Sequence, residues 1–313
     1  MIAFASAVQE PDGYREHAGP GIALAAEPGS VVDVLAATSS VCRSLNLLLD
    51  RAAARDDLEA LVIVGEDAQI TDPDLCAKVR RALADPDVAV VGCVGATGVA
   101  GAAWWEGAVV AGDVRLRYGE FGGGELDAFA WARAGRPPAE VDAVAGFLLA
   151  VSPWAVAALR FDETLALGIG YEVDFCAQAR EAGRKVVVED LGVLHHASLE
   201  LAEEPEAWTE AHVRLAEKWD GRLPGAPPRP DDWKTRARLA EAERDAAQTI
   251  LFSEYSRREA QLLPLQRELD AMTSTLGWKL TEPLRLANAY RRWKARGGSP
   301  PWKAQERQRR PRG

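Results

Sequence analysis

Short runs of apolar residues alternate with amphipathic segments along the first two hundred residues of the chain. The runs that predict strands buried on both faces lie at 1–8, 31–37, 61–65 and 88–95. Between them, helices are predicted over 44–54 and from Pro73 onwards, where Thr71 or Asp72 is placed to cap the helix. This alternation predicts an α/β fold in which a mostly parallel sheet is flanked by helices.

The pattern is less regular in the middle of the chain. Residues 104–118 alternate and turn, as in a hairpin or a pair of short strands. Residues 119–138 contain three consecutive glycines and a Pro-Pro pair, which predict a mobile loop of the kind that often serves as a lid or a binding segment. An apolar run over 141–152 predicts another buried strand, and residues 171–183 predict a helix that ends at a glycine. A valine-rich strand and a short apolar run with two histidines follow.

Composition changes after Ser198, and the predicted organisation changes with it. A sheet-forming domain is predicted over 1–200. Residues 201–235 are rich in Glu, Trp and Pro, which predicts an extension and a Pro-rich linker. The charged, amphipathic residues 236–296 predict an α-helical extension, and residues 297–313 predict a disordered basic tail.

The overall composition is that of a globular protein. The chain has 313 residues, of which 48% are hydrophobic and 27% are charged. It contains no apolar run of the roughly 18 residues that a membrane-spanning helix needs, and its start lacks the basic stretch of a secretory signal. The four cysteines lie far apart in the sequence, which argues against a disulfide framework and a structural zinc site. A cytoplasmic location is therefore expected.

Charge is distributed unevenly along the chain. The segment from Leu284 to Gly313 holds ten Lys or Arg and one acid, although the net charge of the whole chain is −10. Such a basic end either meets an anionic surface or simply keeps the chain soluble. Nucleic-acid binding is not expected, because the body is acidic and the basic residues are not interleaved with aromatic residues as they are in recognition modules.

Two acids, Glu66 and Asp67, directly follow the apolar run at 61–65. In open α/β sheets, ligands bind beyond the carboxyl ends of the strands. A carboxylate at this position is suited to hold Mg²⁺ or Mn²⁺ against a diphosphate, because hard cations take oxygen ligands from protein and phosphate together. The alternative is an acid pair that caps the next helix or is merely solvated.

Two further pairs of residues carry candidate chemistry. Glu172 and Asp174 lie in the first turn of a predicted helix, where the helix dipole favours acids. A carboxylate there is suited to act as a general base, or it only stabilises the helix. His195 and His196 follow an apolar run and are candidates for binding a metal or a phosphate, or for a structural role.

The order of these features resembles a family-2-type glycosyltransferase with the GT-A (Rossmann-like) fold, in the branch grouped with a streptomycin-biosynthesis protein. The resemblance covers roughly residues 1–198. It rests on the acid cluster in VGEDAQI, on W-W-E-G at 104–107, on the buried segment VDAVAGFLLAV, on the helix opening YEVDF at 171–175, and on the closing valine-rich strand with its histidine.

This resemblance implies an inverting transfer of a sugar from a nucleoside-diphosphate sugar to a hydroxyl of a glycan or small-molecule acceptor, as in polysaccharide biosynthesis. Asp67 would bind Mn²⁺ or Mg²⁺, and His195 or His196 would complete the metal or phosphate shell. Glu172 would be the catalytic base, with Asp174 supporting the same helix start. The substrate-binding residues that the resemblance implies are Glu66, Trp104, Trp105 and Glu106.

Two positions depart from the family pattern. Gly65 stands where the metal motif usually begins with Asp, and Glu172 is one methylene longer than the usual Asp base. These departures raise an alternative function, a catalytically inactive scaffold of the same fold in a glycan-assembly complex. The sequence lacks the G-x-G-x-x-G and G-x-x-x-x-G-K-S/T motifs, which argues against a dehydrogenase or an ATPase.

The segment STLGWKLTEPLR at 274–285 resembles the tail of many bacterial glycan-assembly glycosyltransferases. A basic amphipathic helix that carries Trp278, Tyr290 and Trp293 suits an anionic membrane surface. It would place the protein peripherally at the inner face of the cell membrane. The alternative is a helix that packs on the catalytic domain or on a partner helix.

Overall fold

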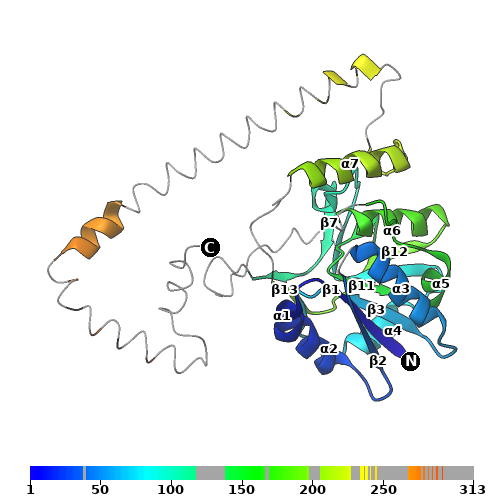
Figure 1. Cartoon of the computed structure of the whole chain (residues 1–313), viewed down its shortest axis with the longest axis horizontal. Helices are drawn as coiled ribbons and strands as arrows, with labels where there is room; N and C mark the ends of the chain where they lie inside the picture. Colours follow the sequence, from blue (N-terminus) through cyan, green and yellow to red (C-terminus); the bar gives the residue numbers. More distant parts are fainter. Residues whose placement is uncertain are drawn as a thin grey trace. The chain divides into compact units, whose positions relative to one another are not determined.

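The computed structural model describes residues 1–37, 40–117, 138–165, 169–196 and 205–226, and scattered residues beyond 232. The chain divides into two compact units, Met1–Pro228 and Arg229–Gly313 (Figure 1). In the second unit, residues 267–274 are helical and largely exposed. The predicted loop at 119–138 lies outside the described residues except for Pro138, as do most of the predicted helical extension and all of the basic tail.

The first unit is built on a seven-stranded sheet with the strand order β2-β1-β3-β11-β5-β12-β9. Its strands are β1 (Ile2–Val8), β2 (Val31–Ala36), β3 (Ala60–Val64), β5 (Val88–Gly92), β9 (Ala139–Val141), β11 (Leu148–Val151) and β12 (Lys185–Val188). Strands β2, β1, β3, β5 and β12 are parallel, whereas β11 and β9 are antiparallel to their neighbours. The predicted mostly parallel sheet is therefore confirmed, with one antiparallel strand in its centre.

Two three-stranded sheets adjoin the large one. Their strands are β6 (Val94–Thr97), β7 (Val109–Gly112) and β10 (Ala143–Val144) in one, and β4 (Ala68–Ile70), β8 (Arg115–Leu116) and β13 (Val193–His195) in the other. Residues 104–118 therefore contain two short strands, but these do not form a hairpin, because β7 pairs with β6 and β8 pairs with β13.

The helices follow the amphipathic segments. They are α1 (Pro11–Gly13), the π-helix η1 (Tyr14–Ala18), α2 (Gly19–Ala25), α3 (Val41–Ala53), α4 (Leu75–Ala82), the 3₁₀-helix η2 (Trp104–Glu106), α5 (Pro153–Ala158), α6 (Tyr171–Glu181) and α7 (Pro205–Trp219). Ser40 caps α3 by accepting a hydrogen bond from the backbone N–H of Arg43. Helix α4 begins at Leu75, later than predicted, because the Asp72 carboxylate accepts the N–H of Asp74 at 2.8 Å and forms a turn instead.

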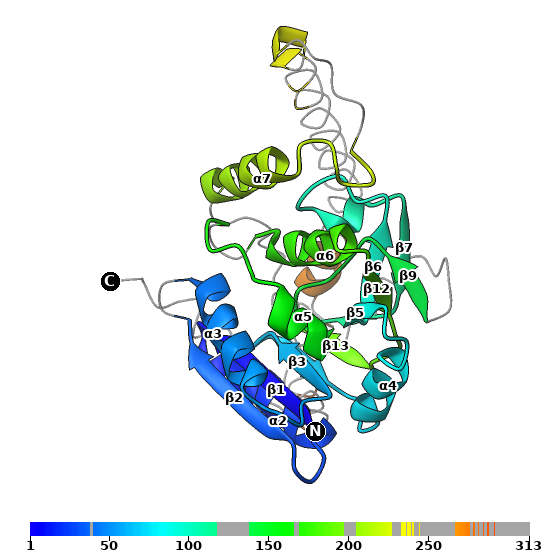
Figure 2. The same ribbon diagram turned by 90° about the vertical axis from the view of Figure 1, so that its right-hand side faces the viewer.

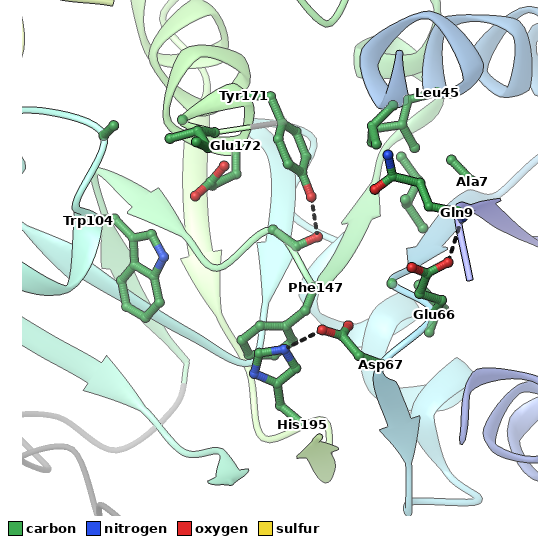
Figure 3. A pocket seen from close by; sticks show the side chains of 18 of the residues that line it. Ala7, Gln9, Leu45, Glu66, Asp67, Trp104, Phe147, Tyr171, Glu172 and His195 are labelled. Carbon is green, nitrogen blue, oxygen red and sulfur yellow. Dashed lines mark hydrogen bonds and ion pairs between the residues drawn. The ribbon is translucent and has the colours of Figure 1, made fainter. Parts of the chain in front are cut away.

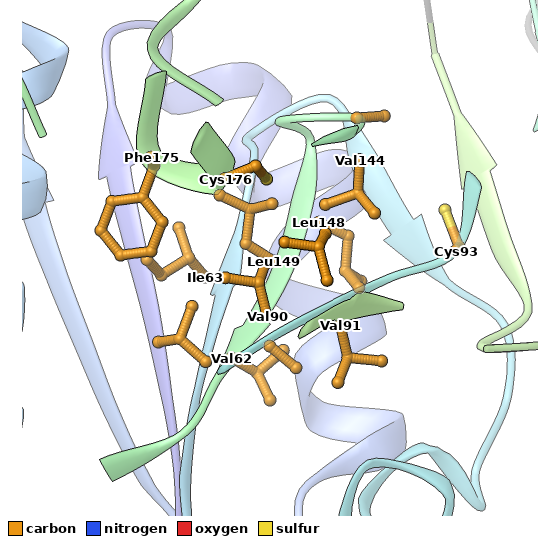
Figure 4. Packing of buried hydrophobic residues seen from close by; sticks show 14 of the residues in the cluster. Val62, Ile63, Val90, Val91, Cys93, Val144, Leu148, Leu149, Phe175 and Cys176 are labelled. Carbon is orange, nitrogen blue, oxygen red and sulfur yellow. The ribbon is translucent and has the colours of Figure 1, made fainter. Parts of the chain in front are cut away.

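Helices α3, α5 and α6 cover one face of the large sheet, the face nearest the viewer in Figure 2. Strands β3 and β5 are buried at every position, as expected for parallel strands covered on both sides. Figure 4 shows part of this core, where side chains of β3, β5, β11 and α6 belong to one buried cluster: Val62, Ile63, Val90, Val91, Leu148, Leu149, Phe175 and Cys176. Helix α6 itself contacts β5, β10 and β12. Each such buried side chain stabilises the fold by about 1.5–3 kcal/mol, so the start of α6 is firmly placed above the sheet.

Residues 201–235, predicted as an extension and linker, include the 15-residue helix α7. Ala211, Leu215 and Trp219 recur at intervals of four and are buried within the first unit. The boundary between the two units, at Pro228, falls inside this predicted segment. Across the helices that the structure describes, we find none with the length and apolar character needed to cross a membrane.

Candidate active site

An open cavity of about 350 Å³ lies at the carboxyl edge of the large sheet (Figure 3). It is lined by the ends of β1 and β3, the turn before β11, the first turn of α6, the end of β13, and residues of η2, α3 and α7. Ligands of open α/β sheets bind in this place, because the connecting loops diverge there and leave a crevice. Its volume is within the range of small-molecule sites.

Asp67 and His195 form a pair on the floor of the cavity. The Nε2 atom of His195 lies 2.9 Å from Oδ2 of Asp67. Asp67 lies in the turn between β3 and β4, whereas His195 ends β13, far away in sequence. The ring of Phe147 stacks on the imidazole with its centroid 4.3 Å away, and this fixes the orientation of the histidine. Burial raises the pKa of Asp67, but the hydrogen bond and charge of His195 outweigh that effect and hold the pKa below its usual 3.8. The aspartate side chain remains 47% exposed, so its carboxylate is open to a ligand.

Glu66 lines the cavity as well, but its carboxylate is engaged with the backbone. Its Oε2 atom accepts hydrogen bonds from the N–H groups of Gln9 and Glu10, at 2.6 and 2.8 Å. Burial raises the pKa of Glu66, and these two hydrogen bonds act against that shift. The residue thus ties the end of β1 to the end of β3.

Gly65 brings the end of β3 close to the turn that precedes β11. Its N–H donates to the carbonyl of Phe147 at 2.8 Å. A Cβ at this position would lie 3.0 Å from Oδ1 of Asp67 and 3.3 Å from that carbonyl. An Asp in place of Gly65 would therefore displace Asp67, which gives a local reason for glycine here.

Glu172 opens helix α6 and points into the cavity opposite Asp67 (Figure 3). Gly170, with φ +73°, makes the sharp entry into the helix that aims this side chain. Glu172 is only 8% exposed, and burial raises the pKa of its carboxyl to about 7. Among the described residues, no other side chain donates a hydrogen bond to this carboxylate. A carboxyl group with these properties is poised to exchange a proton near neutral pH.

Asp174 lies two residues further along α6, outside the set that lines the cavity. It is fully buried, and it accepts hydrogen bonds from Nε1 of Trp219 at 2.9 Å and from Gln178 at 2.7 Å. Nζ of Lys218 forms an ion pair with it at 2.8 Å. Asp174 therefore holds α7 against α6.

The remaining predicted residues divide into two groups. Trp104 and Trp105 line the cavity, with their rings at 84° and centroids 6.0 Å apart. Glu106 is exposed and is not among the cavity residues. His196 is also outside the cavity: its Nε2 atom lies 3.0 Å from Oε1 of Gln69, and its ring stacks on His17. Burial, together with the nearby His17 and Arg117, lowers the pKa of His196 to about 4.

Asp67 and His195 together provide a carboxylate and an imidazole as possible metal ligands. Within the described ranges, no group of three or more His, Cys, Asp or Glu side chains is arranged to hold a metal ion. One carboxylate and one imidazole are both ligands that Mn²⁺ accepts. Mg²⁺ in nucleotide sites is commonly held by one or two carboxylates, with substrate phosphates and water supplying the other ligands. The donor set therefore fits a cation shared with a diphosphate.

Trp208 and Tyr171 are cavity residues that the sequence did not single out as candidates. Trp208 reaches the cavity from α7, within a segment predicted as a linker. Tyr171 precedes Glu172, and its hydroxyl donates to the carbonyl of Gly146 at 3.1 Å, which fixes the turn before β11. The spacing of Ala211, Leu215 and Trp219 is the sequence signal that would have revealed α7.

The fold and the cavity define a class of protein: an α/β protein with a ligand site, containing acids and a histidine, at the carboxyl edge of its sheet. Comparison with known proteins narrows this class. Residues 3–217 match the family described as a glycosyltransferase-like family. Because this match covers more than half of the sequence, the chain belongs to that family, in agreement with the predicted GT-A type of fold.

Individual relatives were found among characterised proteins and solved structures. The chain is 30% identical over 180 residues to the streptomycin biosynthesis protein StrF of Streptomyces griseus; the match spans 56% of this chain and 60% of StrF. A mannosyltransferase of Pyrobaculum calidifontis, solved with GDP-Man and Mn²⁺, is 15% identical with a TM-score of 0.46, covering 89% of this chain and 81% of its own. GalNAc-T7, solved with UDP, GalNAc and Mn²⁺, is 13% identical with a TM-score of 0.47, covering 70% and 48%.

Proposed function

We propose that the chain transfers a sugar, with inversion, from a nucleoside-diphosphate sugar to a hydroxyl of a glycan or small-molecule acceptor. One observation carries the proposal: the buried Glu172 carboxyl and the Asp67–His195 pair line the same cavity. A general base and a diphosphate-binding group are the two functions that such a displacement requires. Membership of the glycosyltransferase-like family supports the same reaction class.

In this reaction Glu172 takes the proton of the acceptor hydroxyl. The acceptor oxygen forms the new bond to the anomeric carbon while the bond from that carbon to the diphosphate oxygen breaks. The raised pKa of Glu172 matches this task, because a base works best when its pKa lies near the working pH. The extra methylene relative to Asp moves the carboxylate further into the cavity from the helix start.

Asp67 and His195 would hold a divalent cation, Mn²⁺ or Mg²⁺, against the diphosphate. When bound, such a cation neutralises the charge that develops on the departing nucleoside diphosphate. Phe147 keeps the His195 ring in place for this role, and Glu66 keeps the ends of β1 and β3 together. Trp104 and Trp105 would contact substrate in the part of the cavity beside Glu172.

A catalytically inactive scaffold of the same fold is the second candidate. It is favoured by Gly65, which replaces an expected acid, and by the engagement of the Glu66 carboxylate with the backbone of Gln9 and Glu10. Under this alternative the cavity would retain its shape without binding a donor.

Calorimetric titration with a panel of nucleoside diphosphates, with Mn²⁺ and with a chelator, tests the proposal. We expect the protein to bind one nucleotide in a metal-dependent manner, and Asp67→Asn to lose that binding. Asp50→Asn is the matched control, because Asp50 is exposed on α3 and pairs only with Arg160 among the described residues. Failure of the folded protein to bind any nucleotide of the panel would contradict the proposal and favour the scaffold.

A further inference from the structure

The end of the cavity beside Glu172 has an aromatic wall, and the proposed reaction does not specify which substrate it contacts. Trp105 and Trp208 line it from η2 and α7, with ring centroids 5.9 Å apart and a 32° angle between the ring planes. Both side chains are half-buried, so each retains a surface that faces the cavity. Aromatic side chains of this size are normally more completely covered, and an open pair in a cavity indicates a ligand.

The pair is held rigidly from behind. The buried Trp104 packs edge-on against Trp105, and the imidazole of His212 packs on Trp208 with centroids 4.8 Å apart. Helix α7 is in turn fixed by Lys218, whose Nζ atom pairs with Asp174 at 2.8 Å and with Asp162 at 2.7 Å. A preorganised aromatic wall binds a ligand without the entropic cost of ordering its own side chains.

The wall lies at the opposite end of the cavity from β1. Figure 3 shows Gln9, Leu45 and Glu66 on one side, Trp104 on the other, and Glu172 between Trp104 and the β1 side. If Asp67 and His195 hold the donor diphosphate, as the proposed function states, the tryptophan end is left for the acceptor. Glu172 would then lie between the sugar donor and the acceptor, where it can take the proton of the attacking hydroxyl.

The chemistry of this end favours one kind of acceptor. A pyranose ring presents a face of C–H groups, and the faces of aromatic rings carry the negative potential that attracts them. Its hydroxyls extend from the ring edge, where the Glu172 carboxylate and the carbonyl of Gly146 provide acceptors. A flat aromatic ligand would cover the tryptophans but leave the buried carboxylate without a partner, which is costly.

We propose that Trp105 and Trp208 form a stacking subsite for a pyranose ring, so that the acceptor of the proposed reaction is a saccharide. Helix α7 is thereby part of the substrate site and not only a packing element. This inference rests on the proposed function for the placement of the acceptor, but the subsite itself can be measured separately from the donor.

The test uses the full chain with a nucleoside diphosphate and Mg²⁺. Binding of each member of a panel of methyl hexopyranosides is then detected by saturation-transfer NMR. Trp208→Ala removes the wall, and Trp208→Phe retains an aromatic face. Trp154→Ala is the control, because Trp154 is equally half-buried but lies on α5 outside the cavity. We expect saturable binding of at least one pyranoside, weakened about tenfold in Trp208→Ala. Trp208→Phe should lose less binding than Trp208→Ala, and Trp154→Ala should bind as the parent does.

Donor binding is measured on the same variants by calorimetry. Unchanged nucleotide binding in Trp208→Ala, together with loss of the pyranoside, supports the subsite and shows that the variant is folded. Equal pyranoside binding by the parent and Trp208→Ala overturns the inference, and so does a protein that binds the nucleotide but no pyranoside. Binding of phenol without any pyranoside would assign the wall to an aromatic acceptor instead. Pyranoside binding without nucleotide binding would contradict the donor site and leave the subsite standing.

Discussion

Two acids stand two residues apart at the start of α6, and their surroundings are opposite. Glu172 faces the cavity without a side-chain partner among the described residues, and burial raises its pKa to about 7. Asp174 faces α7 and is bound by Lys218, Trp219 and Gln178. Residues at i and i+2 of a helix point in different directions, so the first turn of α6 directs Glu172 towards the cavity and Asp174 towards α7.

This difference separates the carboxyl group that we propose as the base from one that holds two helices together. An unpaired carboxyl in a low-dielectric site keeps its proton up to a higher pH, so it can exchange that proton near neutral pH. A carboxylate that accepts from three donors fixes the elements that supply those donors. Substitutions at the two positions are therefore expected to affect different properties of the protein.

The largest effect is expected from Glu172→Gln. The amide keeps the size of the side chain but cannot take a proton, so we expect transfer to fall by a factor of about 10²–10⁴. Nucleotide binding should be unchanged, which calorimetry checks beside the rate assay. Glu181→Gln is the matched control, since Glu181 is exposed on the same helix and pairs with Arg222. A variant that retains the parental rate would exclude Glu172 as the base.

Asp174→Ala is expected to affect stability instead. It removes the buried partner of Lys218 and the acceptor of the Trp219 indole, and breaking a buried pair typically costs about 3–5 kcal/mol. The loss should fall at the lower end of this range, because Lys218 is 34% exposed and keeps its ion pair with Asp162. Urea unfolding measures this change in the free energy of unfolding. Asp50→Ala, at an exposed ion pair with Arg160, should cost less than about 1 kcal/mol. Equal losses in the two variants would show that Asp174 does not hold α7.

The free energy of unfolding should also depend on pH through Glu172. Its pKa is raised from 4.5 in the unfolded chain to about 7 in the folded one, so the folded state binds the proton more tightly between these values. Stability from this group is complete below the unfolded pKa and is lost as the pH rises through the folded pKa. Glu172→Gln lacks that loss, so its stability relative to the parent should rise by up to about 3 kcal/mol between pH 4.5 and pH 7. A difference that does not vary with pH would contradict the raised pKa.

The smallest effect is expected from Gly65→Ala. The new Cβ would lie 3.0 Å from Oδ1 of Asp67, so that carboxylate has to shift by a few tenths of an ångström. We expect metal-dependent nucleotide binding to weaken by a factor of about three to ten. Gly101→Ala should bind as the parent does, because a Cβ there meets only a carbon of His212 at 3.9 Å. Tighter binding by Gly65→Ala would run against the geometry proposed for Asp67.

The sequence was sufficient for the elements whose pattern is local. Apolar runs located β1, β2, β3, β5 and β12, and the carboxyl-edge rule placed the acids after β3 at a ligand site. Only the family resemblance assigned Glu172 to that same site. The direction of β11 was not predictable in the same way. An apolar run has the same composition whichever way the strand lies, and only its pairing with β3 and β5 settles the direction.

Several candidate residues illustrate a different limit. His195 and His196 are adjacent at the end of a strand, where successive side chains point to opposite faces, so the pattern already implied that they would separate. The engagement of Glu66 with the backbone of Gln9 and Glu10 depends on contacts between distant segments, and no local pattern encodes it. Trp208 was missed because the Pro and Glu content of its segment obscured a helical spacing.

The attachment of α7 sets a limit on how the chain can be shortened or recombined. A chimera joined at residue 200, where the composition changes, would exchange Lys218 and Trp219 for foreign residues while retaining Asp174. Such a hybrid would leave the buried Asp174 carboxylate without its lysine partner, two residues from Glu172, and its cavity would lack Trp208. A segment exchanged between proteins should therefore extend past Trp219. If α7 is replaced, the new helix must supply a lysine and a tryptophan at the positions of Lys218 and Trp219.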